Sequence, residues 1–151
     1  MGAGKCQWVH IGDHVCNSSY SVDKKDITQA IEYKYVGDYI ANKLETLYTK
    51  RWEKAQGYSA SCLAMCTEMS LGYRLYSTAK MLHMSIFVNG TLLNMETWPR
   101  FTNNRMETFE RVEQNYFRRI LKAHSKTPIE ALYLELGVAP LRFQLMKKRV
   151  M

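Results

Sequence analysis

Two segments of the first forty residues, 6–11 and 31–40, have an alternating pattern with a period of two. Residues 6–11 follow this alternation, and Gly12 with Asp13 marks a turn behind them. Residues 17–26 are polar and predict a loop or a short edge strand. Residues 31–40 place isoleucine, three tyrosines and a glycine on one side, which predicts a strand with one aromatic face.

Further along the chain the apolar period becomes helical. Gly57 is expected to bend or divide the first helix, and Gly72 to separate it from a second helix over Leu75–Thr97. Trp98 precedes a proline and should end that second helix, because such a residue avoids the helical region. The apolar stripe of the first helix consists of Leu44, Tyr48, Trp52, Ala55, Cys62, Cys66 and Met69.

A third helix is predicted from about Asn104 to Ala123. The segment 127–130 (TPIE) then predicts a capping box with proline at the first helical position. Gly137 should close this short helix, and Pro140 should open another that continues to the end of the sequence. The stripe of the third helix is Met106, Phe109, Val112, Tyr116 and Ile120, flanked by Phe117 and Leu121.

The order of elements predicts an α-rich α+β fold, with a small N-terminal antiparallel β hairpin or sheet followed by a bundle of four or five helices. The expected domains are residues 1–42 and residues 43–151. A three-stranded sheet without further partners is a poor domain by itself, so we expect the first part to belong to something larger.

Charge is unevenly distributed between these two parts. The chain has 21 Lys and Arg against 14 Asp and Glu, a formal net charge of +7. Residues 1–42 carry a net charge of −1, whereas residues 43–151 hold 17 basic groups against nine Glu, a net of +8. A cationic surface of this kind favours a polyanion, either nucleic acid or an anionic membrane.

Two features argue against a secreted or membrane protein. The most apolar stretch, Met81–Met95, is short and interrupted by polar residues, and the N-terminus MGAGKCQW has no apolar core. We therefore expect an intracellular protein, cytoplasmic or nuclear, with no membrane partner and with reduced cysteines.

A zinc site formed by Cys6, His10, His14 and Cys16 is one alternative. If residues 5–11 form a strand, however, Cys6 and His10 lie about 13 Å apart, at about 3.3 Å per residue. One ion cannot bridge that distance, so we predict no metal site and no cofactor. Cys62 and Cys66, one helical turn apart, are assigned to the core.

Six blocks of sequence occur in order along the chain: KCQWVHIG (5–12), YKYVGDYI (33–40), EMSLGYRLYSTAKML (68–82), TLLNMETW (91–98), TFERVEQNYFRRIL (108–121) and TPIEALYLELGVAPLRF (127–143). In this order and spacing the chain resembles the reverse transcriptases of non-LTR (LINE-type) retrotransposons, over about residues 5–150. The resemblance implies that the first two blocks come from the end of the palm, the second being the hairpin that grips the primer. It also implies that residues 43–151 form a thumb-like helical region.

The sequence departs from that family at the catalytic centre. Polymerases of the family hold two metal ions with aspartates, two of them adjacent in an aromatic-x-Asp-Asp turn. This chain has no Asp-Asp pair and no Asp after Asp38. The fingers and most of the palm would lie before residue 1. We therefore expect part of an RNA-directed DNA polymerase that is inactive on its own and has no catalytic residue.

The resemblance also implies positions for nucleic-acid binding. Tyr35 and Gly37 would be the primer grip, because glycine lets a backbone approach closely and an aromatic ring packs on sugar or base. The alternative is an aromatic sheet face packed on the first helix.

The first helix provides the expected phosphate contacts: Lys43, Lys50, Arg51 and Lys54. A helix lying along a duplex can place such cations against the backbone without reading sequence, and a solvated charged face is the alternative. Further basic clusters are Arg118, Arg119 and Lys122, and Arg142, Lys147, Lys148 and Arg149.

The expected function is sequence-independent binding of template–primer nucleic acid, such as an RNA–DNA hybrid, by a truncated reverse-transcriptase-like protein. The parent function implied by the resemblance is RNA-templated DNA synthesis during retrotransposition. The alternative is an inert transposon relic or a protein–protein interaction module that self-associates through an exposed palm-facing surface.

Overall fold

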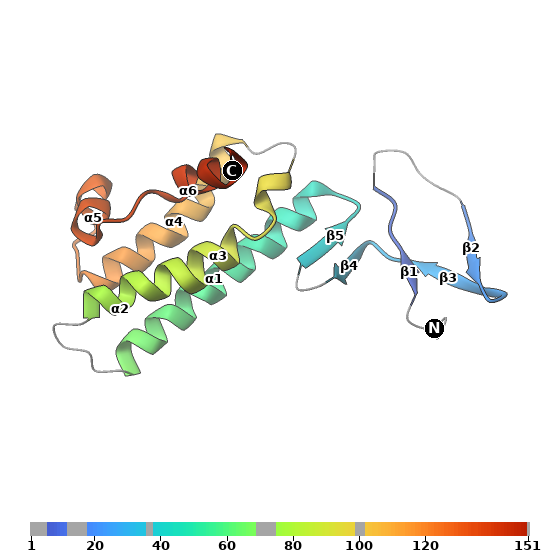
Figure 1. Cartoon of the computed structure of the whole chain (residues 1–151), viewed down its shortest axis with the longest axis horizontal. Helices are drawn as coiled ribbons and strands as arrows, with labels where there is room; N and C mark the ends of the chain where they lie inside the picture. Colours follow the sequence, from blue (N-terminus) through green and yellow to red (C-terminus); the bar gives the residue numbers. More distant parts are fainter. Residues whose placement is uncertain (1–5, 12–17, 36–37, 69–74, 99–101, 151) are drawn as a thin grey trace. The chain divides into compact units, whose positions relative to one another are not determined.

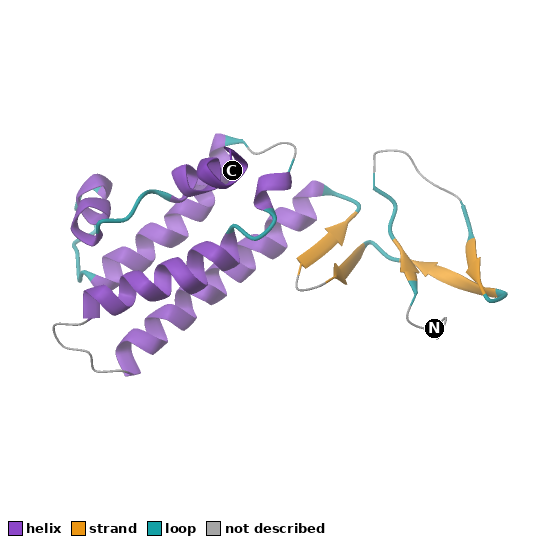
Figure 2. Cartoon of the chain, viewed as in Figure 1, coloured by secondary structure: helices purple, strands orange, loops and turns teal. Residues whose placement is uncertain are grey.

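The computed structural model describes residues 6–11, 18–35, 38–68, 75–98 and 102–150. It has the α-rich α+β fold expected from the sequence, with the strands before residue 42 and the helices after it (Figure 2). The chain forms two compact units, Met1–Arg51 and Trp52–Met151. The strands give way to helix between Ala41 and Leu44, as expected, but the two units divide within the first helix.

The first sheet of the N-terminal unit has the strand order β1-β3-β2. Strand β1 (Gln7–Trp8) pairs with β3 (Lys25–Gln29) in parallel, and β2 (Tyr20–Val22) pairs with β3 in antiparallel orientation. The parallel pair was not expected. It brings the first strand, distant in sequence, beside β3, which begins within the segment 17–26 that was expected to be a loop or a short edge strand.

Asp23 and Lys24 form a two-residue turn between β2 and β3. Their φ angles are 53° and 62°, so both residues are left-handed, as a type I′ hairpin turn requires. Asp tolerates this conformation better than most residues, but Lys does not, and the usual glycine is absent. The hairpin therefore carries no strong sequence signal, which explains why only a short edge strand was anticipated.

Residues 31–40 do not form the single strand with one aromatic face that the alternation predicted. They form an antiparallel hairpin of β4 (Glu32–Tyr35) and β5 (Asp38–Ala41), in which Tyr33 lies opposite Ile40 and Lys34 opposite Tyr39. Side chains opposite one another share a face, so Tyr39 lies on the face of Lys34 and away from Tyr33. The prediction was wrong because the antiparallel pairing places odd-numbered positions of β4 opposite even-numbered positions of β5.

Helix α1 (Leu44–Glu68) is continuous through Gly57, so the expected bend or division is absent. A methyl group added at Gly57 would meet nothing within 4 Å, which shows that no close contact depends on this glycine. Glycine costs about 1 kcal/mol relative to alanine in a helix, and the packing on either side of it offsets this cost. The buried stripe of α1 is Tyr48, Arg51, Ala55, Ser59, Cys62 and Cys66.

The stretch expected as one helix over Leu75–Thr97 begins as predicted, but its helix type changes from α to π and back to α. It consists of α2 (Leu75–Leu82), a π-helical segment η3 (His83–Val88) and α3 (Asn89–Thr91). A separate 3₁₀ turn, η4 (Met95–Thr97), follows, and its N-cap residue Asn94 is left-handed. Trp98 has ψ 125° and is extended, as expected before proline, but it ends the 3₁₀ turn, because the second helix has already ended at Thr91.

Helix α4 (Asn103–Ile120) buries the predicted stripe, with Val112 half-buried, and adds two carboxylates to it, Glu110 and Glu113. Figure 1 shows α1, α2 with α3, and α4 running alongside one another in the helical unit, with α5 (Ile129–Leu136) and α6 (Leu141–Val150) against α4. The core of this unit includes Phe87, Leu92, Met95, Phe109, Tyr116, Phe117, Leu132 and Leu141.

The predicted capping box at the start of α5 is absent. Pro128 has ψ 141° and is the N-cap residue, so it is not the first helical residue, and no side chain caps the helix. The helix starts one residue later than expected, which moves Glu130 out of the position that a capping box requires. Thr127 instead donates its backbone N–H to the carbonyl of His124.

Gly137 ends α5 as predicted, in the left-handed conformation with φ 58°. Its N–H donates to the carbonyl of Leu134, and the N–H of Val138 donates to that of Tyr133, each at 3.1 Å. These two bonds form a Schellman motif. Lys80 Nζ donates to the Gly137 carbonyl at 2.8 Å, which ties the end of α5 to α2.

Candidate nucleic-acid interface

Lys50 is held against the β4–β5 hairpin. Its Nζ lies 3.4 Å from Glu32 Oε1 and 5.7 Å from the centre of the Tyr39 ring. Glu32 and Tyr39 belong to the face that the hairpin register also gives to Lys34, so register and contacts agree. The charge of Lys50 is therefore partly neutralised within the unit, although its side chain stays about one-third exposed.

Arg51 does not lie on an exposed basic face. It is 2% exposed and has interactions within the protein. In α1 it follows Tyr48 by three residues and precedes Ala55 by four, so it falls on the buried stripe. Arg51 is therefore unsuited to an exposed phosphate contact, and the role predicted for it is not supported by its position.

The other predicted interface residues are placed as follows. Lys43 is exposed immediately before α1, and Lys54 is half-buried with interactions of its own. The backbone of Tyr35 pairs with Asp38, and Gly37 lies outside the described residues. Nucleic-acid binding by these four residues stays a prediction.

Two arginines of the expected basic clusters serve internal contacts. Arg118 donates from Nη1 to the carbonyl of His124 at 2.8 Å and from Nη2 to that of Thr127 at 3.0 Å, so it holds the connection between α4 and α5. Arg142 donates from Nε to Glu110 Oε1 at 2.8 Å, and this carboxylate raises the pKa of the guanidinium.

The remaining cations of those clusters are exposed. At the end of α6, Lys147, Lys148 and Arg149 form what we call the α6 basic cluster. Arg149 also donates to the Trp98 carbonyl at 3.2 Å. Arg119 is exposed at the end of α4. Cations at helix C-termini are favoured by the helix dipole, so these positions are compatible with a stable fold.

A buried polar network at the centre of the helical unit was missed by the sequence prediction. Glu113 accepts three hydrogen bonds: from His83 Nε2 at 2.8 Å, from the Tyr133 hydroxyl at 2.7 Å and from the Leu141 N–H at 3.3 Å. These donors come from three different elements, so the carboxylate joins η3, α5 and α6 to α4. A signal existed in the sequence, since Glu113 follows Phe109 by four residues on the apolar stripe.

His83 packs among aromatic rings while it holds Glu113. Its ring stacks on Phe87 with centroids 5.4 Å apart and lies 4.8 Å from the ring centre of Phe117. His83 Nδ1 is buried without a hydrogen-bond partner among the described residues. The proton of a neutral ring therefore belongs on Nε2, because it then donates to the carboxylate and leaves only an acceptor unpaired.

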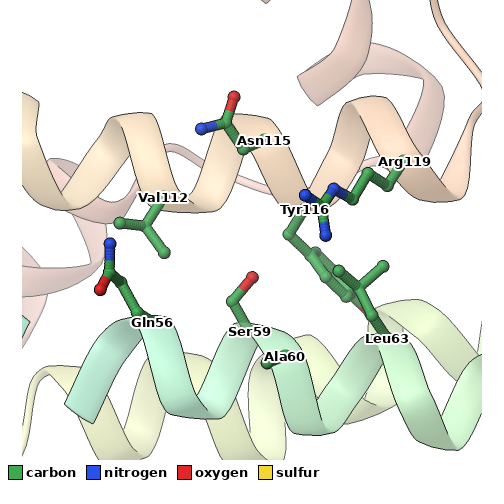
Figure 3. Close-up of a pocket in the computed structure, with 8 residues that line it drawn as sticks. All are labelled: Gln56, Ser59, Ala60, Leu63, Val112, Asn115, Tyr116 and Arg119. Atoms are coloured by element: carbon green, nitrogen blue, oxygen red, sulfur yellow. The ribbon is translucent and has the colours of Figure 1, made fainter. Parts of the chain in front are cut away.

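A groove of about 180 Å³ lies between α1 and α4 (Figure 3). Leu63 and Val112 provide apolar walls. Gln56 and Ser59 line the groove from α1, and Arg119 lines it from α4. The groove is therefore mixed in character, with polar groups from both helices at its surface.

The cysteines show no catalytic or metal-binding arrangement in the part of the chain that the structure describes. Cys62 and Cys66 are buried, which confirms their assignment to the core, and Cys6 is a half-buried free thiol. Burial, with a smaller contribution from Cys66, raises the pKa of the Cys62 thiol to about 11. This thiol is protonated at neutral pH and is not a nucleophile. Among the described residues, no group of three or more His, Cys, Asp or Glu could hold a metal ion.

Over the described ranges, none of the helices combines the length and the apolar character that a bilayer crossing needs. Comparison of the chain with protein-family models, with curated proteins and with solved structures gave no match.

Proposed function

We propose that this chain binds duplex nucleic acid through the phosphate backbone, without reading sequence, as the thumb-side part of a non-LTR retrotransposon reverse transcriptase. The observation that carries the proposal is the charge of the helical unit. Residues 52–151 hold 14 Lys and Arg against eight Glu, a net charge of +6. Two of those eight carboxylates, Glu110 and Glu113, are buried and used in internal hydrogen bonds.

Glu110 is paired with Arg142, so this ion pair leaves the net charge of +6 unchanged, and the helical unit carries an excess of positive charge. Such an excess attracts polyanions by counterion release, which needs no defined base contact. The resemblance of the sequence blocks to the thumb of reverse transcriptases supports a template–primer duplex as the polyanion. The α6 basic cluster is the exposed group of the helical unit to which we assign phosphate contacts. Lys43, in the N-terminal unit, is assigned a phosphate contact of its own.

The test is the anisotropy of a labelled RNA–DNA hybrid titrated with the purified chain at several salt concentrations. We expect affinity to fall steeply with salt, with a slope of about −0.9 per phosphate neutralised. The double variant Lys147→Gln/Lys148→Gln should lower the magnitude of that slope by about two. The matched control is Lys24→Gln/Lys25→Gln, which removes two exposed lysines from the N-terminal unit, where charges balance.

Two results would reject the proposal. One is no binding at low salt by a folded protein, and the other is an equal decrease of the salt slope in both double variants. Magnesium-dependent primer extension is not expected, because the sequence supplies no aspartate cluster. Extension of a labelled primer by the purified chain would contradict that expectation.

The second candidate function is self-association, and the exposed apolar face of α6 favours it. Phe143, Met146 and Val150 are 56%, 57% and 88% exposed and lie at three- and four-residue steps. An exposed apolar stripe of this kind is typical of a protein–protein contact. Sedimentation velocity across a concentration series tests it, and a monomer at every concentration would remove this candidate.

A further inference from the structure

Ser59 lines the groove between α1 and α4, and its hydroxyl differs from those of three other helical residues. Ser85, Thr49 and Thr108 each donate to the backbone carbonyl four residues earlier, at 2.8, 3.1 and 3.1 Å. Ser59 is only 8% exposed, yet its hydroxyl has no partner among the described residues. Figure 3 shows this hydroxyl pointing from α1 across the groove toward α4. Among the described residues, the Ser59 oxygen is not one of the buried polar atoms that lack a partner, so this hydroxyl is accessible from the groove to a ligand.

Arg119 places its guanidinium over the same groove. The side chain extends from α4 above Leu63, with its nitrogens toward the Ser59 side of the groove (Figure 3). Unlike Arg118, which holds two backbone carbonyls, Arg119 has no hydrogen bond or ion pair within the described ranges. No Asp or Glu lines the groove. The groove therefore offers an uncompensated positive charge, with the Gln56 amide at its edge.

We propose that the groove between α1 and α4 binds a phosphate group, with Arg119 and Ser59 as its principal donors. The guanidinium fork can hold two oxygens, while the hydroxyl of Ser59 approaches from the opposite wall. Donors on opposite walls suit a tetrahedral oxyanion, whose oxygens point in different directions. A planar carboxylate would occupy the fork and leave Ser59 without a bond. The inference is independent of duplex binding, because free phosphate is its simplest ligand.

The test is a ¹H–¹⁵N NMR titration of the full chain with sodium phosphate, against sodium chloride at matched ionic strength. Phosphate should cause saturable shifts at Arg119 Nε–H, at the Gln56 side-chain amide and at the Ser59 N–H. Chloride should leave these signals in place. The inference is overturned if the shifts are absent, or if they appear equally at all exposed arginines, which would indicate only an ion atmosphere.

Arg119→Gln removes the charge and the fork, and should weaken phosphate binding by about tenfold or more. Arg111→Gln is the matched control, because Arg111 is exposed on the same helix but does not line the groove. It should change the affinity by less than about twofold. Equal weakening in the two variants would overturn the assignment of the site.

Ser59→Ala removes the opposing donor and should weaken binding by about fivefold while the fork stays in place. Alanine is smaller than serine and favours helix, so this variant should fold, and circular dichroism checks it. An unchanged phosphate affinity in a folded Ser59→Ala protein would show that the hydroxyl contacts no ligand and would reject the two-walled site.

Competition identifies the source of the phosphate. Displacement of bound phosphate by a 5′-phosphorylated dinucleotide, but not by its unphosphorylated form, supports a nucleotide or a nucleic-acid end. If the 5′-phosphorylated dinucleotide does not displace bound phosphate, the result supports a free small ligand. Failure of this site is distinguishable from failure of the proposed function, because hybrid binding through the α6 basic cluster does not require Arg119.

Discussion

Nε2 of His83 lies 2.8 Å from Oε1 of Glu113, and both side chains are completely buried. Together with Tyr133 and the Leu141 N–H, this pair forms the polar centre of the helical unit. A buried carboxylate is costly unless donors surround it, and here three donors do so. The network therefore makes the packing of α4 against η3, α5 and α6 specific.

Glu113→Ala should destabilise the chain by about 3–5 kcal/mol, because it leaves three buried donors without an acceptor. Urea unfolding followed by circular dichroism measures this loss. Glu107→Gln, an exposed change on the same helix, should shift the free energy of unfolding by no more than about 0.5 kcal/mol. Similar stability of the two variants would show that the network contributes little.

Gly90→Ala should destabilise the protein by about 1–3 kcal/mol, because the added Cβ would lie 2.6 Å from Cε2 of Tyr58. Gly57→Ala makes the same chemical change where a Cβ meets nothing within 4 Å. It should stabilise α1 by about 0.5–1 kcal/mol. Thermal unfolding of both variants gives the comparison, and a stabilising Gly90→Ala would mean that the α1–α3 approach is looser than described.

Stability should fall between about pH 9 and pH 11. Burial raises the pKa of Cys62 from its ordinary value near 9 to about 11, and it also raises the pKa of Tyr116 and of Tyr133. Burial favours the neutral form of each of these side chains in the folded state. Their contribution to the free energy of unfolding is therefore complete below the pKa that each group has in the unfolded chain. It is lost as the pH rises from that value through the higher pKa of the folded state. For Cys62 the loss approaches about 3 kcal/mol. Urea unfolding midpoints at pH 7.5 and pH 11 test this prediction. The midpoint of the Cys62→Ala variant should decrease less between these two pH values than that of the unmodified protein.

Lys43→Gln and Arg51→Gln should have opposite effects, although both remove one charge near the start of α1. Lys43 is exposed, so its loss should lower the salt dependence of hybrid binding by about one phosphate and leave the unfolding midpoint unchanged. Arg51 is 2% exposed and engaged in interactions, so its loss should cost about 2 kcal/mol of stability. Anisotropy and urea unfolding of both variants give the answer. A stable Arg51→Gln protein with weakened hybrid binding would show that Arg51 contacts the nucleic acid.

The sequence by itself determined the α-rich α+β fold, the extent of α4 and the end of α5 at Gly137. These features depend on local physics, namely the helical spacing of apolar residues and the left-handed conformation that glycine adopts easily. The burial of Arg51 was not predicted, although its spacing from Tyr48 and Ala55 places it on the apolar stripe.

Only the tertiary structure decided the register of the β4–β5 hairpin and the parallel pairing of β1 with β3. The paired residues of β1 and β3 are distant in sequence, so no local pattern specifies their pairing. The same holds for the hydrogen bonds of Glu113 and for the meeting of Ser59 with Arg119 across a groove. A charged residue on an apolar stripe shows where it lies on its helix, but its partners come from other helices, and only packing brings them together.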